Sequence, residues 1–127
     1  MVSKQLSPSV LAFVGDGVYS LLVREKLAQV NRRSGDLHSL SVKFVNAAAQ
    51  AEAFAVIEPE LTVEEMSVFK RGRNFHTSSS PKNSTRVEYH TATGLETLFG
   101  YLHLSGSSIR AQELFDKIWE NFCIKEQ

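Results

Sequence analysis

Two carboxylates occur where a carboxylate is costly, inside apolar segments that have a helical pattern. Asp16 lies between Gly15 and Gly17 in LAFVGDGVYS, and Glu96 lies one helical turn before Gly100 in GLETLFGYLHL. A glycine in a helix interior costs about 0.5–1 kcal/mol relative to alanine, and a buried carboxylate without a partner costs still more. A chemical role shared by the two carboxylates would explain why the chain accepts both penalties.

Such a pair of carboxylates suits a hard divalent cation. Mg²⁺ prefers oxygen ligands, and it typically keeps several waters while using one or two carboxylates. Small residues on both segments, Gly15 and Gly17 on the first and Gly100 on the second, would let the two backbones approach closely. The spacing therefore predicts that Asp16 and Glu96 come within reach of one ion.

The middle of the chain contains a strongly basic segment. Residues 70–89 read KRGRNFHTSSSPKNSTRVEY and contain a single acid, whereas acids gather in EPELTVEE at residues 58–65. The glycine, proline, asparagine and serine residues at 72–84 predict a long loop, and loops of about 12 residues or more in compact domains are usually functional or disordered. Basic residues in this segment suit phosphate contacts, and duplex RNA is read largely through its phosphates and 2′-hydroxyls. The basic residues of the segment are Lys70, Arg71, Arg73, Lys82 and Arg86.

Helices are the elements expected to position these side chains. Ser7 followed by Pro8 is an N-cap and first-turn signal, and Thr62 followed three residues later by Glu65 is a capping box. The first helix has apolar residues on nearly all sides, which predicts a buried central helix with Asp16 inside it. No segment alternates with period two over the length of a strand, so the fold class is all-α. The predicted helices cover residues 8–29, 36–57 and 87–104, with a short helix from 63 and a last helix from 107 or 108.

Composition places the chain among ordinary globular domains. It has 127 residues, of which 43% are hydrophobic and 22% are charged, so we expect a single domain over residues 1–127 with a genuine core. Fourteen basic and fourteen acidic residues cancel, so the net charge does not indicate a partner. The single cysteine, Cys123, excludes an internal disulfide and a multi-cysteine metal cage. Neither an apolar stretch of about 18 residues nor a secretory leader is present, which predicts a cytoplasmic protein.

Four motifs in order resemble the catalytic domain of ribonuclease III. LAFVGDGVYS is similar to the GDAV signature of that family, and GLETLFGYLHL is similar to its second acidic helix. RGRN followed by PKN, with LHSLSVKFVNAAAQA earlier in the chain, narrows the resemblance to Mini-ribonuclease III, the short branch that consists of the catalytic domain alone. The resemblance covers about residues 6–122.

This resemblance implies a ribonuclease III-like helical bundle that forms a homodimer and cleaves double-stranded RNA with Mg²⁺, for which Mn²⁺ can substitute. The implied role is maturation of large-subunit (23S) ribosomal RNA precursors in the bacterial cytoplasm, with a plastid relative left open. The implied products have 5′-phosphate and 3′-hydroxyl ends, and no double-stranded-RNA-binding domain is expected. Asp16 and Glu96 match the catalytic and metal-binding positions of the family. The positions that match its RNA-binding segments are Arg71, Arg73, Asn74, Lys82 and Asn83.

The chain departs from the larger family at four positions near these motifs. Ala12 stands where that family has a glutamate, four residues before the signature aspartate, and Thr93 stands where it has an aspartate. The short branch shares both losses, which leave two carboxylates per site and predict fewer protein ligands and more water around the ion. Gly17 replaces the usual alanine and should loosen the helix, and Ser20 replaces a common glutamate.

The residues by themselves leave other interpretations open. Asp16 could pair with Arg24, Lys43 or a backbone group, Glu96 could face solvent, and the basic segment could be a solvated loop. One alternative function is a non-catalytic helical module that binds duplex RNA or a protein partner through the same loop. Another is a structural dimerisation domain that binds no RNA. The chain has no Walker-type loop, HExxH spacing or GxSxG elbow, so those enzyme classes are not indicated.

Overall fold

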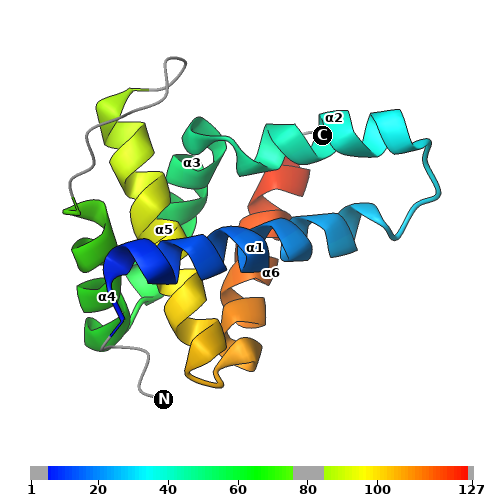
Figure 1. Cartoon of the computed structure of the whole chain (residues 1–127). Coiled ribbons are helices and arrows are strands. Elements are labelled where there is room, and N and C mark those ends of the chain that lie inside the picture. Colours follow the sequence, from blue (N-terminus) through cyan, green and yellow to red (C-terminus); the bar gives the residue numbers. More distant parts are fainter. Residues whose placement is uncertain (1–5, 76–84, 126–127) are drawn as a thin grey trace.

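The computed structural model describes residues 6–75 and 85–125 and contains only helical elements within these two ranges (Figure 1). The predicted all-α class is therefore confirmed. The helices, including the short 3₁₀ turn η2, are α1 (Pro8–Leu27), α2 (Ser34–Val45), α3 (Ala47–Ile57), η2 (Glu58–Glu60), α4 (Val63–Arg73), α5 (Arg86–Leu104) and α6 (Ser108–Lys125).

Side-chain caps fix the starts of α1, α4 and α5. The Ser7 hydroxyl accepts a hydrogen bond from a backbone N–H in the first turn of α1. Thr62 and Glu65 form the predicted capping box at the start of α4, with bonds of 3.1 and 2.9 Å. A second capping box, which was not predicted, joins Thr85 and Glu88 at the start of α5. These caps satisfy backbone donors that the helices themselves leave unpaired.

The second helix predicted over residues 36–57 is two helices that meet at Asn46. Asn46 has an extended backbone with ψ 164°, and its side chain accepts a hydrogen bond from the Ala49 N–H at 2.8 Å. Its amide also donates to the Val42 carbonyl, so one residue ends α2 and begins α3. The prediction of one continuous helix was therefore wrong.

In the described ranges no single helix is long and apolar enough to cross a membrane. Only the pair of α2 with α3–η2, bent by 57°, meets the length and composition requirement for a membrane span.

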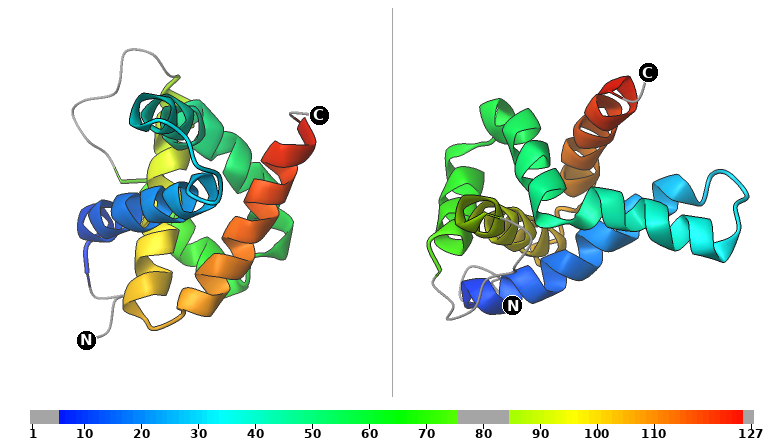
Figure 2. Two further views of the ribbon diagram at one scale, coloured as in Figure 1. Left: turned by 90° about the vertical axis from the view of Figure 1, so that its right-hand side faces the viewer. Right: turned by 90° about the horizontal axis from the view of Figure 1, so that it is seen from above.

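Helix α5 is the central helix of the bundle. Figures 1 and 2 show it enclosed by α1, α3 and α4, with α6 beside it and with α2 and the end of α1 extending to one side. The predicted apolar face of α5 is buried as expected, with Leu95, Leu98, Phe99 and Leu102 all in the core. Burial of this face against several helices stabilises the bundle and fixes the orientation of α5.

Helix α1 lies on the surface of the bundle, so the prediction that it is the buried central helix was wrong. One face, which includes Tyr19 and Val23, is fully buried. The opposite face exposes Val10, Phe13 and Leu21, and the Phe13 side chain is 81% exposed. Apolar periodicity on two faces cannot indicate which face is covered within the same chain. An exposed apolar stripe of this kind is a candidate contact surface.

Replacing Gly17 by alanine is expected to raise the free energy of unfolding by about 0.5–1 kcal/mol. A β-carbon on Gly17 would have no atom within 4 Å, so the added methyl restricts the unfolded chain without a clash. Urea denaturation of Gly17→Ala beside the wild type measures the change. A loss of stability would instead mean that the added methyl meets another chain packed closely against this face of α1.

Candidate active site

The crossing of α1 and α5 brings the two predicted carboxylates together. A β-carbon on Gly15 would lie 1.6 Å from the Glu96 carbonyl oxygen, and one on Gly100 would lie 1.9 Å from the Leu11 carbonyl oxygen. Both contacts are with backbone atoms, so only glycine fits at either position. The predicted close approach of the two helices is confirmed. It places Asp16, next to the crossing on α1, near Glu96 on α5.

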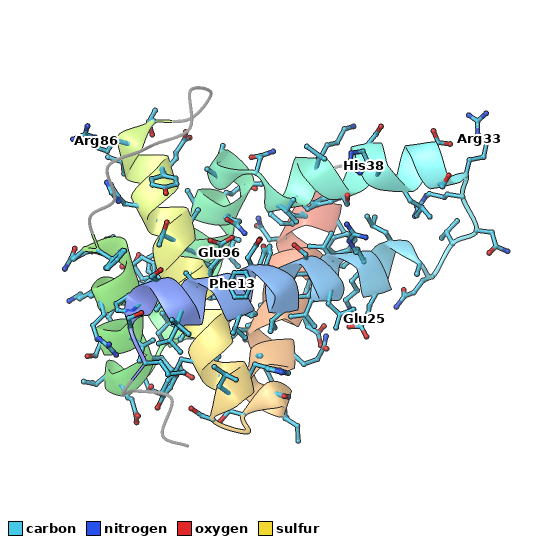
Figure 3. The ribbon with its side chains drawn as sticks, viewed as in Figure 1. Phe13, Glu25, Arg33, His38, Arg86 and Glu96 are labelled. Atoms are coloured by element: carbon cyan, nitrogen blue, oxygen red, sulfur yellow. The ribbon has the colours of Figure 1, made fainter. Side chains whose placement is uncertain are left out.

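Asp16 and Glu96 line the same cleft, which has a volume of about 290 Å³. Figure 3 shows Glu96 and Phe13 where α1 passes in front of α5. Asp16 is exposed and Glu96 is half-buried, so the prediction of a buried Asp16 was wrong. The other residues that line the cleft are Ser9, Ala12, Phe13, Phe75, Tyr89 and Thr93.

Glu96 occupies an environment that disfavours its charge. Its burial, and then the negative charge of Asp16, raise the pKa of the Glu96 carboxyl to about 8. A hydrogen bond from the Gln50 side chain acts in the opposite direction and lowers that pKa. Two carboxylates held this close repel each other when both are ionised. A divalent cation that prefers oxygen ligands would remove the repulsion, so the donor set fits such an ion.

Comparison with known proteins decides the family. A sequence model described as the ribonuclease III domain matches residues 9–107, which is most of the chain. The chain belongs to the ribonuclease III family. As a member of that family, it is an endoribonuclease.

Relatives narrow this assignment to the Mini-ribonuclease III branch. A Mini-ribonuclease 3 of Thermoanaerobacter sp. is 45% identical over 112 residues, which are 87% of this chain and 79% of the relative. The Mini-ribonuclease 3 of Brevibacillus brevis is 43% identical over 94% of this chain and 88% of its own. The Mini-ribonuclease 3 of Enterococcus faecalis is 39% identical over 97% of this chain and 92% of its own. A crystal structure of a Fusobacterium nucleatum protein is similar, with a TM-score of 0.84 and 26% identity over 92% of this chain and 94% of that one.

Two of the four positions at which the sequence is expected to depart from the larger ribonuclease III family lie in the same cleft. Ala12 and Thr93 line it beside the two carboxylates. The Thr93 hydroxyl donates to the Tyr89 carbonyl within α5, at 3.0 Å, so it already has a partner. In the two described ranges, no three His, Cys, Asp or Glu side chains come together as a metal site. The cleft therefore offers two carboxylates, as the sequence predicted.

The basic residues predicted to bind RNA lie partly on a helix. Helix α4 continues to Arg73 with Asn74 as its C-cap, so the prediction that the loop begins at residue 72 was wrong. Arg71 donates to the Leu6 carbonyl at 3.1 Å, and Arg73 donates to the Asn74 side chain at 3.1 Å and lies over the Phe69 ring. Arg71, Arg73 and Asn74 do not line the cleft, although the nearby Phe75 does. Lys82 and Asn83 lie outside the described residues.

Two buried polar side chains near Glu96 were not predicted. Gln50 of α3 is 2% exposed, and its amide nitrogen lies 3.4 Å from Glu96 Oε2. The Tyr19 hydroxyl is buried without a hydrogen-bond partner in the described part of the chain, and its burial and the Glu96 charge raise the pKa of Tyr19. The only sequence signal for Gln50 is that it and Glu52 are the two polar residues among the alanines of α3.

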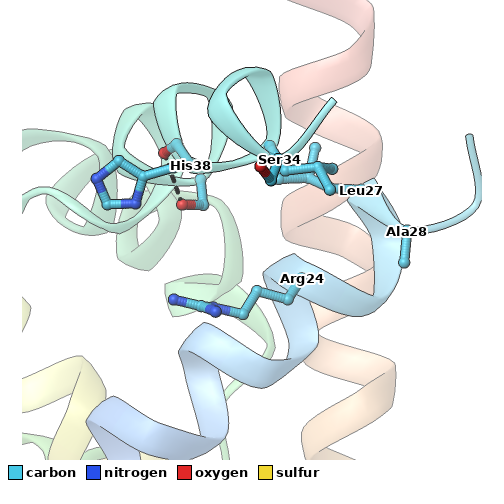
Figure 4. Close-up of a pocket in the computed structure, with 7 residues that line it drawn as sticks. Arg24, Leu27, Ala28, Ser34 and His38 are labelled. Atoms are coloured by element: carbon cyan, nitrogen blue, oxygen red, sulfur yellow. Dashed lines mark hydrogen bonds between the residues drawn. The ribbon is translucent and has the colours of Figure 1, made fainter. Parts of the chain in front are cut away.

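A second pocket, of about 330 Å³, lies between the end of α1 and α2. Figure 4 shows Arg24 of α1 and His38 of α2 on opposite sides of it. It contains none of the predicted catalytic or RNA-binding residues. The carboxylate cleft is therefore the better candidate for the active site of this ribonuclease III family member.

Proposed function

We propose that this ribonuclease III family member is a Mg²⁺-dependent endoribonuclease that cleaves double-stranded RNA, with Asp16 and Glu96 as its metal ligands. The main supporting observation is that these carboxylates, from two different helices, line one cleft, in which burial and the Asp16 charge raise the pKa of the Glu96 carboxyl. Perturbed carboxyl groups in a cleft are typical of functional sites. The proposed substrate is a precursor of 23S ribosomal RNA in the bacterial cytoplasm.

The two carboxylates have different parts in the proposed mechanism. Asp16 is exposed and can bind from the open side of the cleft, whereas Glu96 is half-buried and held against the interior. The chemistry that a bound Mg²⁺ supplies at such a site is activation of a water for in-line attack on a phosphodiester and neutralisation of charge on the departing 3′ oxygen. With two protein ligands, most of the coordination would be water. The products would have 5′-phosphate and 3′-hydroxyl ends.

Arg71, Arg73, Asn74, Lys82 and Asn83 are the proposed RNA-binding residues. The C-terminal turn of α4 provides the first two, together with Lys70, and three basic side chains in one turn suit phosphate contacts. Duplex RNA does not require base contacts for recognition. Binding that depends on such contacts should weaken steeply as salt is added.

Metal affinity at the proposed site is expected to rise with pH until the solution passes the Glu96 pKa of about 8. Below that pKa a proton occupies the carboxyl and competes with the ion, so affinity should fall by up to about tenfold for each pH unit. Titration of Mn²⁺ at several pH values measures the slope. Glu96→Gln should flatten it, and an equally steep slope in that variant would assign the proton to another group.

We also propose that the enzyme is a homodimer formed through the exposed apolar face of α1. Phe13 belongs to this face and also lines the cleft, so a partner chain seated there would border the active site. Phe13→Glu is expected to weaken the dimer by about 2 kcal/mol or more, because it removes an apolar contact and buries a charge. Sedimentation velocity at micromolar concentration measures the change. Ile109→Glu on α6 is the matched control, since Ile109 is also 81% exposed.

A cleavage assay on long duplex RNA, with Mg²⁺ and with a chelator, tests the proposed activity. The expected result is cutting that requires the metal and leaves 5′-phosphate ends. If the protein binds duplex RNA but never cuts it, the chain is a binding module. If it binds no duplex RNA even at low salt, the domain is structural.

A further inference from the structure

Gln50 lies behind the proposed metal site, on a helix that does not itself line the cleft. Its side-chain amide donates to Glu96 Oε2 across 46 positions of sequence, from α3 to α5. We propose that Gln50 is a positioning residue, whose hydrogen bond holds one oxygen of Glu96 and directs the other toward the metal bound with Asp16. This inference rests on the proposed function, because it assigns a task to Gln50 only if the carboxylates hold an ion.

The burial of Gln50 is the first argument for this role. An amide removed from water costs free energy unless it finds a hydrogen-bond partner. Apart from Tyr19, three other residues with polar side chains are buried in the described core, and each has a partner that serves local structure. Ser41 and Thr97 donate to carbonyls of their own helices, and Glu65 completes a cap and an ion pair. Gln50 differs because its partner is a carboxylate of the cleft.

The chemistry of the donor is the second argument. A carboxylate that binds a metal has two oxygens, and a hydrogen bond to one fixes its plane and leaves the other for the ion. An amide does this without adding a positive charge, whereas lysine or arginine would compete with the cation. Gln50 also opposes the burial and the Asp16 charge, which both favour the protonated form of Glu96.

No other side chain in the described ranges is placed to do the same work. The hydroxyl of Tyr19 lies within the electrostatic influence of Glu96 but has no hydrogen-bond partner there. Asp16 does interact with Glu96, and as the second proposed ligand it faces the ion itself. Gln50 therefore supplies the hydrogen bond that comes from behind the cleft.

Replacing Gln50 by methionine tests the role, because methionine keeps the length and approximate volume but cannot donate. Direct binding of Mn²⁺, followed by its electron paramagnetic resonance signal, should weaken by about tenfold or more. The Mg²⁺ concentration for half-maximal cleavage should rise in parallel, while the rate at saturating Mg²⁺ stays close to that of the wild type. Gln112→Met is the matched control, since it removes a comparable amide bond to Asp116 on α6.

Two results from Mn²⁺ binding would overturn the proposal. One is wild-type Mn²⁺ affinity in a folded Gln50→Met protein, and the other is a further loss of affinity when Gln50→Met is added to Glu96→Gln. A measurement without metal does not need the Gln50→Met variant: the side-chain amide resonances of Gln50 should shift between wild type and folded Glu96→Gln, and unchanged resonances would also overturn the proposal. If the wild type neither binds Mn²⁺ nor cuts duplex RNA, the proposed function fails instead. The Gln50 resonances still report whether the hydrogen bond between Gln50 and Glu96 exists.

Discussion

Replacing Asp16 by asparagine together with Glu96 by glutamine is expected to lower the rate of cleavage of long duplex RNA by about 10³-fold or more, which is about 4 kcal/mol of transition-state stabilisation. Both changes keep the shape of the side chains and remove their charge. The cleft then offers no carboxylate to a cation, because Ala12 and Thr93 cannot take over. The rate is measured in a single turnover at saturating Mg²⁺.

RNA binding should survive these two substitutions, since Arg71 and Arg73, the proposed phosphate contacts on α4, do not line the cleft. Filter binding at low salt measures it. The matched control is Asp116→Asn with Glu120→Gln, which removes the same two charges from α6, away from the cleft. If the double variant cuts duplex RNA at the wild-type rate in Mg²⁺, the proposal that Asp16 and Glu96 bind the metal is wrong.

Small residues made the crossing of α1 and α5 predictable from the sequence. Glycines next to Asp16 and one turn after Glu96 indicated close approach, and the structure places Gly15 and Gly100 at one contact, although Gly17 is open. The buried face of α5 was predictable for a related reason, because Leu95, Leu98, Phe99 and Leu102 recur at helical spacing. Periodicity within one segment was enough for these features.

Other features depend on contacts that periodicity cannot report. The apolar pattern of α1 continues around the helix, so it could not show that Phe13 is exposed and Tyr19 is buried. The break at Asn46 lies within a continuous helical pattern, and the side chain of this residue caps both the end of α2 and the start of α3. Gln50 is 46 positions from Glu96, and no local spacing connects the two.

Replacing Gly100 by alanine is expected to lower the free energy of unfolding by about 2–3 kcal/mol, even though alanine is the better helix former by about 1 kcal/mol. The new β-carbon would lie 1.9 Å from the Leu11 carbonyl oxygen, so α1 and α5 must separate. Backbone atoms of two helices cannot yield as a flexible side chain can.

Separation of these helices should also move Asp16 away from Glu96, so the folded fraction of Gly100→Ala should bind Mn²⁺ more weakly than the wild type. Urea denaturation gives the stability, and metal titration at low temperature, where the variant stays folded, gives the affinity. Gly17→Ala is the control, because it makes the same change on α1 at a position where the added carbon meets no atom within 4 Å. A Gly100→Ala protein as stable as the wild type would mean that the helices cross elsewhere. Loss of stability with unchanged Mn²⁺ affinity would mean that the crossing supports the bundle without setting the distance between the two carboxylates.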